Sequence, residues 1–408
     1  MQELFKKSVT TIKMTEVKGG YFKEDFSMIN KKAVIFLIIS ILFTVTINTV
    51  LAQETLTYTK IKKDISVNMT IVSASMSEDG RYLAFLDNEG TIYIYNPDTG
   101  GIIKKWLAYS KEDEGVSGDR WDYDLKHAKG AILLSPKGNY VISQAGKSKI
   151  VKLFSLSDKN ESNPGAVEFK LPDQVSCFAF SPNEELIAFG TRGFDAGNTV
   201  FVYNTKTSNK LWDIQQSAPK IEPPKSQRLG PQGERPVFSV TEQIIKTLAF
   251  NNDGALLASG STDGSILVWE SKTGKAISKF LFSGKKIYAN LFSKDSKKIF
   301  YCSNEFITGS NGIITSIITS GGVIQISDGE IIYFDDTYAQ PSKMITANNE
   351  DMVIIDKDSG GGIVVWSTKT GKQIEFEMDK VIDFVSGYFV SCKENKDGQT
   401  IISINKIN

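Results

Sequence analysis

Residues 244–280 decide the fold, and their sequence is IIKTLAFNNDGALLASGSTDGSILVWESKTGKAISKF. Four short runs of β-prone residues (TLAF, LLASG, ILVW and AISKF) are separated by the turns NNDG, STDG and ESKTG. Each turn carries Gly or Asn-Asp, which close tight turns and accept a positive φ at low cost. Short strands divided by such regular turns predict an antiparallel sheet of four strands.

The same pattern recurs along most of the chain. Looser copies occupy residues 74–100, 133–156, 177–207, 289–334, 344–376 and 381–404. Repeated units of this length are typical of architectures in which neighbouring units bury each other's faces. Together with residues 244–280, these copies predict seven sheets, the blades of a ring.

The two ends of the repeat region complement each other. The last unit ends at Asn408 before its fourth strand, whereas residues 55–62 (TLTYTKIK) precede the first unit and belong to none. An N-terminal strand in the final blade closes the ring and hides the seam between first and last blades. The leftover strand and the missing strand balance, which supports a count of seven units. The family resemblance given next implies an all-β, seven-bladed β-propeller over residues 53–408, closed by an N-terminal strand.

Residues 244–280 resemble a WD repeat, and the chain resembles a divergent bacterial WD-repeat β-propeller protein. Val268 to Glu270 (VWE) stand where that family has its Trp-Asp dipeptide. Asp263, Ser259 and Trp269 match three positions of the family's hydrogen-bond network, but the expected His is missing. His127 is the chain's one histidine, so at least six blades lack this polar network. Apolar packing between blades must then hold the ring.

The N-terminal region predicts export from the cytoplasm. An uncharged apolar stretch, residues 33–52, follows Lys31 and Lys32, and Val50 and Ala52 provide small residues for cleavage before Gln53. These features describe a secretory signal peptide in residues 1–52, with Met28 as the expected true start. The alternative is an uncleaved membrane anchor at residues 33–52. In both cases the propeller is expected to be extracytoplasmic, either periplasmic or secreted.

Composition excludes several classes of protein. The whole chain carries 47 Lys+Arg and 47 Asp+Glu, which argues against nucleic acid as a partner. Three Cys provide no disulfide framework, and a single His removes most schemes of metal binding and His-based catalysis. We expect no metal and no cofactor.

The long inserts gather on one side of the predicted ring. In a propeller blade, the turns between strands one and two and between strands three and four share one face, here named the turn face. The connections between strands two and three and between blades lie on the opposite face, here named the insert face. The insert face receives the longest connections: residues 108–127, 191–198, 215–238 and 304–322. Long loops often carry binding function, so this face is the candidate binding surface, although bare linkers are the alternative.

Exposed aromatic and arginine side chains are the expected anchors, because they bury large areas and keep a polar group. The first choices are Arg120, Trp121 and Tyr123. The second group of candidates comprises Arg192, Phe194, Pro223, Pro224, Arg228 and Phe306.

These features favour a non-catalytic platform that binds protein partners in the cell envelope or outside the cell. The membrane would be contacted only through the N-terminal segment, if it is uncleaved. The alternatives are a propeller enzyme (a hydrolase or a quinone-dependent dehydrogenase) and a glycan-binding module, each using the channel mouth. An enzyme needs convergent polar groups on the innermost strands, where this sequence offers Asn290 and Asp383 as the strongly polar residues. We therefore expect no catalytic site.

Overall fold

Nearly all of the described secondary structure is antiparallel β-sheet. The computed structural model describes residues 58–60, 62, 64–109, 131–146, 148–157, 164–193, 198–216, 243–308, 314–337, 343–356, 363–374, 381–385, 388–396 and 399–407. Within this part of the chain, no helix has the length and apolar character needed to span a membrane. The predicted signal or anchor at residues 33–52 lies outside the described residues.

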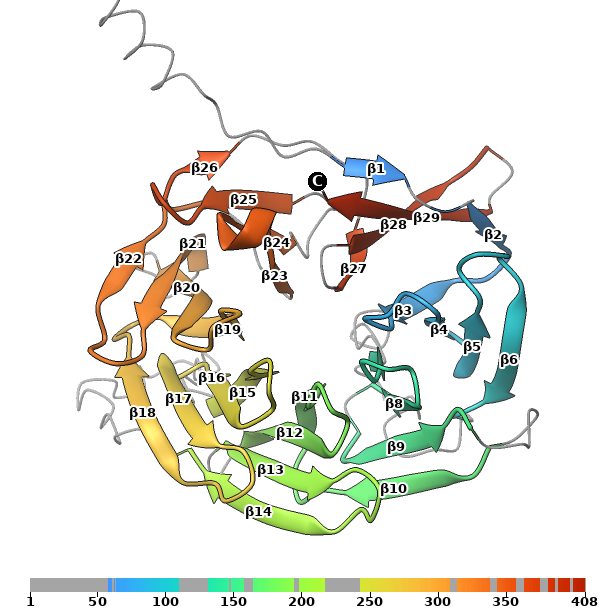
Figure 1. The fold of residues 1–408 in the computed structure, drawn as a ribbon, viewed down its shortest axis with the longest axis horizontal. Coiled ribbons are helices and arrows are strands. Elements are labelled where there is room, and N and C mark those ends of the chain that lie inside the picture. The colour runs from blue at the N-terminus through green and yellow to red at the C-terminus, as the bar shows by residue number, and fades with distance from the viewer. Residues whose placement is uncertain are drawn as a thin grey trace, which may run out of the picture. The chain divides into compact units, whose positions relative to one another are not determined.

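The strands form blades of four in chain order, with the first strand of each blade innermost and the fourth outermost (Figure 1). Blade one contains β3 (Ile71–Met76), β4 (Leu83–Asp87), β5 (Thr91–Tyr95) and β6 (Ile102–Leu107). Blade two contains β7 (Ala131–Leu134), β8 (Tyr140–Gln144), β9 (Ile150–Ser155) and β10 (Ala166–Lys170). Blade three contains β11 (Val175–Phe180), β12 (Leu186–Gly193), β13 (Thr199–Asn204) and β14 (Lys210–Gln215). Blade four contains β15 (Gln243–Phe250), β16 (Leu256–Ser261), β17 (Ser265–Glu270) and β18 (Ala276–Leu281).

The remaining strands build three further blades. Blade five contains β19 (Lys286–Phe292), β20 (Lys298–Thr308), β21 (Ile314–Gln325) and β22 (Ile331–Tyr333). Blade six contains β23 (Met344–Ala347), β24 (Met352–Asp356), β25 (Ile363–Ser367) and β26 (Gln373–Ile374), with the 3-10 turn η1 (Asn348–Glu350) after β23. Blade seven contains β27 (Val381–Val385), β28 (Tyr388–Glu394) and β29 (Thr400–Ile407). The described strands thus confirm the predicted all-β propeller.

An N-terminal strand completes blade seven, as predicted. β1 (Tyr58–Lys60) pairs antiparallel with the end of β29, so that Tyr58 lies opposite Ile407. β2 (Ile65–Val67) pairs with the beginning of the same strand, with Ile65 opposite Ile402. Both ends of the repeat region therefore meet in one sheet (Figure 1).

Apolar side chains hold successive blades together. The described residues form seven apolar clusters, and each cluster combines side chains of two neighbouring blades, the last joining blade seven to blade one. Adjacent residues of the middle strands point to opposite neighbours: Leu257 packs toward blade three and Ala258 toward blade five. Both are fully buried. This two-sided burial explains why the middle strands are continuous apolar runs rather than alternating ones.

Blade four contains a complete hydrogen-bond network at Asp263, Ser259 and Trp269, where the sequence lacks the His of the WD-repeat family. The Trp269 Nε1–H donates to Ser259 Oγ at 2.9 Å, and the Ser259 hydroxyl donates to Gln216 Oε1 at 2.8 Å. The Gln216 amide then donates to Ser265 Oγ at 2.5 Å, and the Ser265 hydroxyl donates to Asp263 Oδ1 at 2.5 Å. Gln216 directly follows β14, and its side chain takes the place of the missing His. An amide can donate and accept at once, so it links both serine hydroxyls without a titratable group.

One predicted insert loop is largely a β-hairpin. Residues 304–322 were expected to be a loop, but β20 and β21 pair from Lys298 opposite Gln325 to Thr308 opposite Ile314. The expectation was wrong because the segment is rich in Ile and Thr, which favour extended pairing over an irregular loop. Blade five therefore extends its second and third strands as a hairpin on the insert face.

Removing the closing strand tests the architecture. Deletion of residues 55–62 should lower the melting temperature by several degrees, because it removes β1 and exposes the edge of β29 with which β1 pairs. Thermal unfolding followed by circular dichroism measures the change. An unchanged melting temperature would contradict closure by β1.

The amide of Gln216 is expected to contribute measurably to stability. Gln216→Ala should lower the free energy of unfolding by about 1–3 kcal/mol, because it removes the hydrogen-bond partner of two buried serine hydroxyls. The neighbouring Gln215 is exposed, so Gln215→Ala is the matched control and should change the value by less than about 0.5 kcal/mol. Urea unfolding of both variants provides the comparison, and equal losses would refute the bridging role of Gln216.

Candidate functional site

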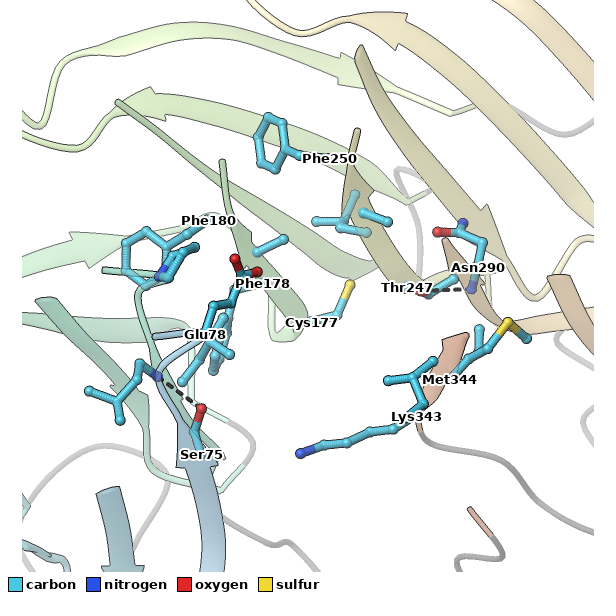
Figure 2. A pocket seen from close by; sticks show the side chains of 18 of the residues that line it. Ser75, Glu78, Cys177, Phe178, Phe180, Thr247, Phe250, Asn290, Lys343 and Met344 are labelled. Atoms are coloured by element: carbon cyan, nitrogen blue, oxygen red, sulfur yellow. Dashed lines mark hydrogen bonds between the residues drawn. The ribbon is translucent and has the colours of Figure 1, made fainter. Parts of the chain in front are cut away.

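A cavity of about 450 Å³ occupies the centre of the ring. Its walls are the innermost strands of blades one to six, and Figure 2 shows their side chains converging from different strands. Most of the lining is apolar, including Leu133, Phe178, Phe180, Leu248, Phe250 and Met344. The polar lining comprises Ser75, Glu78, Cys177, Lys246, Thr247, Asn290 and Lys343.

β-Bulges change the direction of side chains near the insert-face end of the innermost strands. The register shifts between Ile245 and Thr247 in β15, and between Ile287 and Ala289 in β19, so Lys246 and Tyr288 are the extra residues. Equivalent shifts occur in β3, β11 and β27. A bulge frees one residue from the strand alternation and re-aims its side chain.

Lysine and aromatic side chains also meet near the insert-face end of the innermost strands. The Lys246 Nζ lies 5.5 Å from the centre of the Tyr288 ring, and the Lys286 Nζ lies 4.6 Å from the centre of the Phe306 ring. Lys343 stands just before β23 and lines the same cavity as Lys246; Figure 2 shows its side chain extended. We name this group the lysine mouth: Lys246, Lys286 and Lys343, with Tyr288 and Phe306. Stacking on a ring restrains an ammonium group and leaves its positive charge in place.

The opposite end of the cavity carries negative charge. Glu78 follows β3 at the turn face and lines the cavity. Although part of Glu78 is open to solvent, desolvation by the channel walls raises the pKa of its carboxyl, and the nearby carboxylates of Asp79 and Glu184 raise this pKa further. The cavity lining thus includes the carboxyl of Glu78 near the turn face and the ammonium groups of Lys246 and Lys343 near the insert face.

Asn290 presents an unusual buried amide within the cavity wall. Its side chain is 6% exposed, and neither its Oδ1 nor its Nδ2 has a hydrogen-bond partner among the described residues. The backbone N–H of Asn290 donates to Thr247 Oγ1 at 3.3 Å, and the amide lies beside Gly260, whose missing side chain makes room for it. An unpaired buried amide costs about 1–3 kcal/mol, so its retention calls for an explanation.

The thiol in the cavity is not an activated nucleophile. Burial raises the pKa of Cys177 to about 12, which keeps the thiol protonated near neutral pH. Burial likewise raises the pKa of Cys302, which lies between blades five and six. Among the described residues, no group of three or more His, Cys, Asp and Glu side chains is arranged to hold a metal ion.

Two of the predicted anchors lie within the described residues. Arg192 ends up in β12, opposite Ile244 of β15, and is half-buried. Phe306 lies in the β20–β21 hairpin opposite Ile317. They belong to blades three and five, on the same face. The other predicted anchors, Arg120, Trp121, Tyr123, Phe194, Pro223, Pro224 and Arg228, lie outside the described residues.

The sequence did not single out the lysines of the mouth. We expected the innermost strands of blades four and five to begin at Thr247 and Ala289, but β15 begins at Gln243 and β19 at Lys286. The apolar pairs Ile244–Ile245 and Ile287–Tyr288 were the available signal for longer strands. Their extension brings Lys246 into the cavity wall and places Lys286 at the start of β19.

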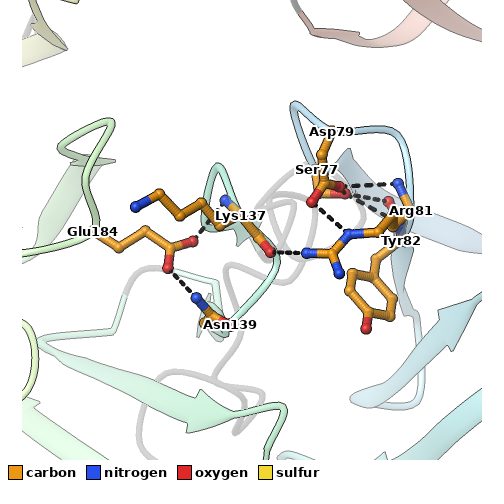
Figure 3. A network of polar contacts seen from close by, with 7 residues as sticks. All are labelled: Ser77, Asp79, Arg81, Tyr82, Lys137, Asn139 and Glu184. Atoms are coloured by element: carbon orange, nitrogen blue, oxygen red, sulfur yellow. Dashed lines mark hydrogen bonds and ion pairs between the residues drawn. The ribbon is translucent and has the colours of Figure 1, made fainter. Parts of the chain in front are cut away.

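The turn face is occupied by contacts between its own turns, as Figure 3 shows. Arg81 pairs with Asp79 in blade one (Nε to Oδ2, 2.6 Å) and donates from Nη2 to the Lys137 carbonyl of blade two at 2.9 Å. The Glu184 carboxylate of blade three accepts the Lys137 backbone N–H at 2.7 Å and the Asn139 amide at 2.6 Å. These polar side chains are thus engaged in joining blades one to three.

Glu184 adopts a backbone conformation that favours glycine. Its φ is 64°, whereas Gly80, Gly138 and Gly254 occupy the equivalent turn position with similar values. A side chain in this region costs roughly 1 kcal/mol. The two hydrogen bonds to blade two give a structural reason for a glutamate at this place.

Comparison with known proteins identifies one repeat directly. Residues 235–270 match the family model "WD domain, G-beta repeat". The chain is also similar to "Protein ROOT INITIATION DEFECTIVE 3" of Arabidopsis thaliana, with 30% identity over 202 residues. That match covers 48% of this chain and 41% of the relative, so the chain spans less than half the length of the relative it matches.

The ion pair on the turn face predicts an acid-sensitive contribution to stability. Partial burial raises the pKa of Asp79, but hydrogen bonds from the Arg81 backbone, the Ser77 hydroxyl and the Arg81 guanidinium outweigh it and leave this pKa below its usual range. The stabilisation is therefore present above the unfolded-state pKa of about 3.9 and is lost as the pH falls through the folded-state pKa. At pH 7, Asp79→Asn should cost at most about 1 kcal/mol.

Unfolding at pH 7 and at pH 2 measures this difference. The gap in stability between the wild type and Asp79→Asn should shrink toward pH 2, whereas Asp336→Asn, on an exposed residue of the connection after β22, serves as the control. A gap that is equally large at both pH values would contradict the assignment.

Proposed function

This chain is a WD40-repeat β-propeller protein, and from that premise we propose that it is a non-catalytic platform that holds protein partners on its insert face. WD40 propellers are typically scaffolds for protein interaction. A closed ring provides rigid positions for several segments at once, which lowers the entropy lost when a partner binds.

The main support for this proposal is the difference between the two faces of the ring. On the turn face, the side chains of blades one to three bond to one another. On the insert face, the β20–β21 hairpin extends beyond the pairing with β19, which ends where Lys286 lies opposite Asn304. Near the end of this hairpin, Ile307 and Ile314 are 40% and 53% exposed. Exposed apolar groups on a rigid strand pair favour contact with another protein.

A platform also agrees with the chemistry of the channel. Its thiol is protonated near neutral pH, and apolar residues make up most of its wall. General acid-base or nucleophilic catalysis needs groups whose pKa values lie near the working pH and that lie within reach of one another.

We further propose that the platform acts outside the cytoplasm, in the envelope of a bacterial cell or beyond it. The sequence supports this proposal. Lys31 and Lys32 precede an uncharged stretch that ends with Val50 and Ala52, small residues typical of a signal-peptide cleavage site. Partners would then be proteins of the envelope or of the surroundings.

Site-specific photo-cross-linking in native cells tests the proposed face. A photoreactive phenylalanine analogue is placed singly at Ile307 or Ile314 on the insert face, and at Asp253 or Lys294 as matched positions on the turn face. All four residues are exposed, so their access to solvent does not bias the comparison.

We expect protein adducts from Ile307 and Ile314 and none above background from Asp253 and Lys294. Adducts confined to the turn face would move the binding surface there. An absence of adducts at all four positions, with the protein present and folded, would contradict a platform that uses the described part of the insert face.

A further inference from the structure

Among the described residues, the β20–β21 hairpin has an edge without a partner strand where it extends beyond β19. We propose that this edge, at residues 306–308 of β20, pairs with an extended segment of a partner protein that is rich in β-branched and aromatic residues. The segment continues the line of β19 as an added strand. This inference rests on the proposed platform function and adds how the partner is held and what kind of segment it offers.

The edge is free because β19 is shorter than β20. β19 pairs with β20 as far as Lys286 opposite Asn304, whereas β20 continues to Thr308. The pairing ends there because the chain enters β19 from a turn, in which the Lys285 backbone N–H donates to the Phe282 carbonyl at 3.2 Å. Within the part of the chain that the structure describes, no other strand takes up this side of β20.

Backbone bonds of the hairpin show which groups face the free edge. Thr319 of β21 exchanges two backbone hydrogen bonds with Thr337, at 2.7 and 2.8 Å, so its N–H and C=O point away from β20. In an antiparallel pair, opposite residues direct their backbone groups either toward each other or outward, and the two kinds alternate along the strands. Asn304, opposite Thr319, therefore points toward β19, and Phe306 points the same way. The Phe306 N–H and C=O are thus a donor and an acceptor for an added strand.

This edge lacks the features that protect an exposed strand from pairing. Natural proteins protect such edges with charged residues, with Pro or with bulges. Residues 306–308 are Phe, Ile and Thr, and the bulge of the hairpin lies in β21, where Thr315 is the extra residue. The outer strands β6, β10, β14 and β18, by contrast, all carry charged side chains: Lys104, Lys105, Glu168, Lys170, Lys210, Asp213 and Lys279.

Side chains around the edge define the kind of segment that fits. Ile307 is 40% exposed, and Phe306 and Ile318 are half-buried. β-Branched and aromatic residues of an added strand pack well against such neighbours. Glu305 and Lys286 bring one charge of each sign to the two strands at this edge, and the Lys286 ammonium contacts the Phe306 ring. The charge on these strands therefore favours neither an acidic nor a basic segment.

Proline substitutions at two opposed residues test the edge directly. Phe306 and Ile317 lie opposite each other, and their N–H groups point to opposite edges of the hairpin. Proline at either position removes no hydrogen bond between β20 and β21, and strand edges tolerate it. Phe306→Pro removes the donor at the free edge, whereas Ile317→Pro is the matched control. Phe306→Ala removes the ring and keeps the N–H.

The probe is a fluorescein-labelled peptide selected on the full chain from a random dodecapeptide library displayed on phage. The selected sequences should be enriched in Val, Ile, Thr, Phe and Tyr. In fluorescence polarisation, Phe306→Pro should weaken binding by at least about tenfold. Ile317→Pro should change it by less than about twofold. N-methylation of alternate peptide amides should abolish binding in one of its two patterns and not in the other, because one set of N–H groups faces β20.

Each outcome bears on the proposal. Equal losses in the two proline variants, or a loss in Phe306→Ala as large as in Phe306→Pro, would contradict recognition through the free backbone edge. A dimer of the full chain that Phe306→Pro dissociates in sedimentation velocity would assign the edge to a second copy instead. A failure to select any peptide, alongside cross-links from Ile307 or Ile314, would overturn this inference and leave the platform function intact.

Discussion

Burial of the middle strands on both faces is the constraint on which this structure depends. Leu257 and Ala258 are neighbours in the chain, yet they pack toward different blades. Burying a large apolar side chain contributes about 1.5–3 kcal/mol relative to exposure. Every blade therefore needs two neighbours, and a row of blades satisfies this need only when it closes. The pairing of β1 with β29 is the consequence of that requirement at the ends of the chain.

Because the middle strands are fixed by closure of the ring, the structure differs between blades mainly at the strand ends and their connections. On the turn face, short turns bond to one another, and Glu184 even retains a positive φ while its carboxylate joins two blades. On the insert face, strands continue beyond the ring and bulges re-aim Lys246 and Tyr288. On one face of this rigid ring the turns bond to one another, and on the other face strands project beyond the ring. Such a ring is suited to holding a partner on the face from which the strands project.

The repeat pattern was sufficient to predict the fold, whereas the site needed geometry. Turn spacing and apolar runs report local pairing, so the blades and the closing strand followed from residues such as those of 244–280. A bulge has no comparable signal, and for that reason the role of Lys246 was missed. Gln216 was also missed, since it acts across a long chain separation, on Ser259 and Ser265. Of the predicted anchors, Phe306 contributes to the lysine mouth, and Arg192 lies in strand β12.

Hydrogen–deuterium exchange of the full chain, with and without a partner protein identified by cross-linking through Ile307 or Ile314, tests the central claim most directly. Our account predicts slowed exchange in the β20–β21 hairpin and in the neighbouring strands β15 and β19 when the partner is bound. It predicts no change in the turns at residues 77–80, 135–138 and 181–184. Slowed exchange confined to those turns, or to the outer strands β6, β10 and β18, would contradict an insert face that binds through the mouth of the channel.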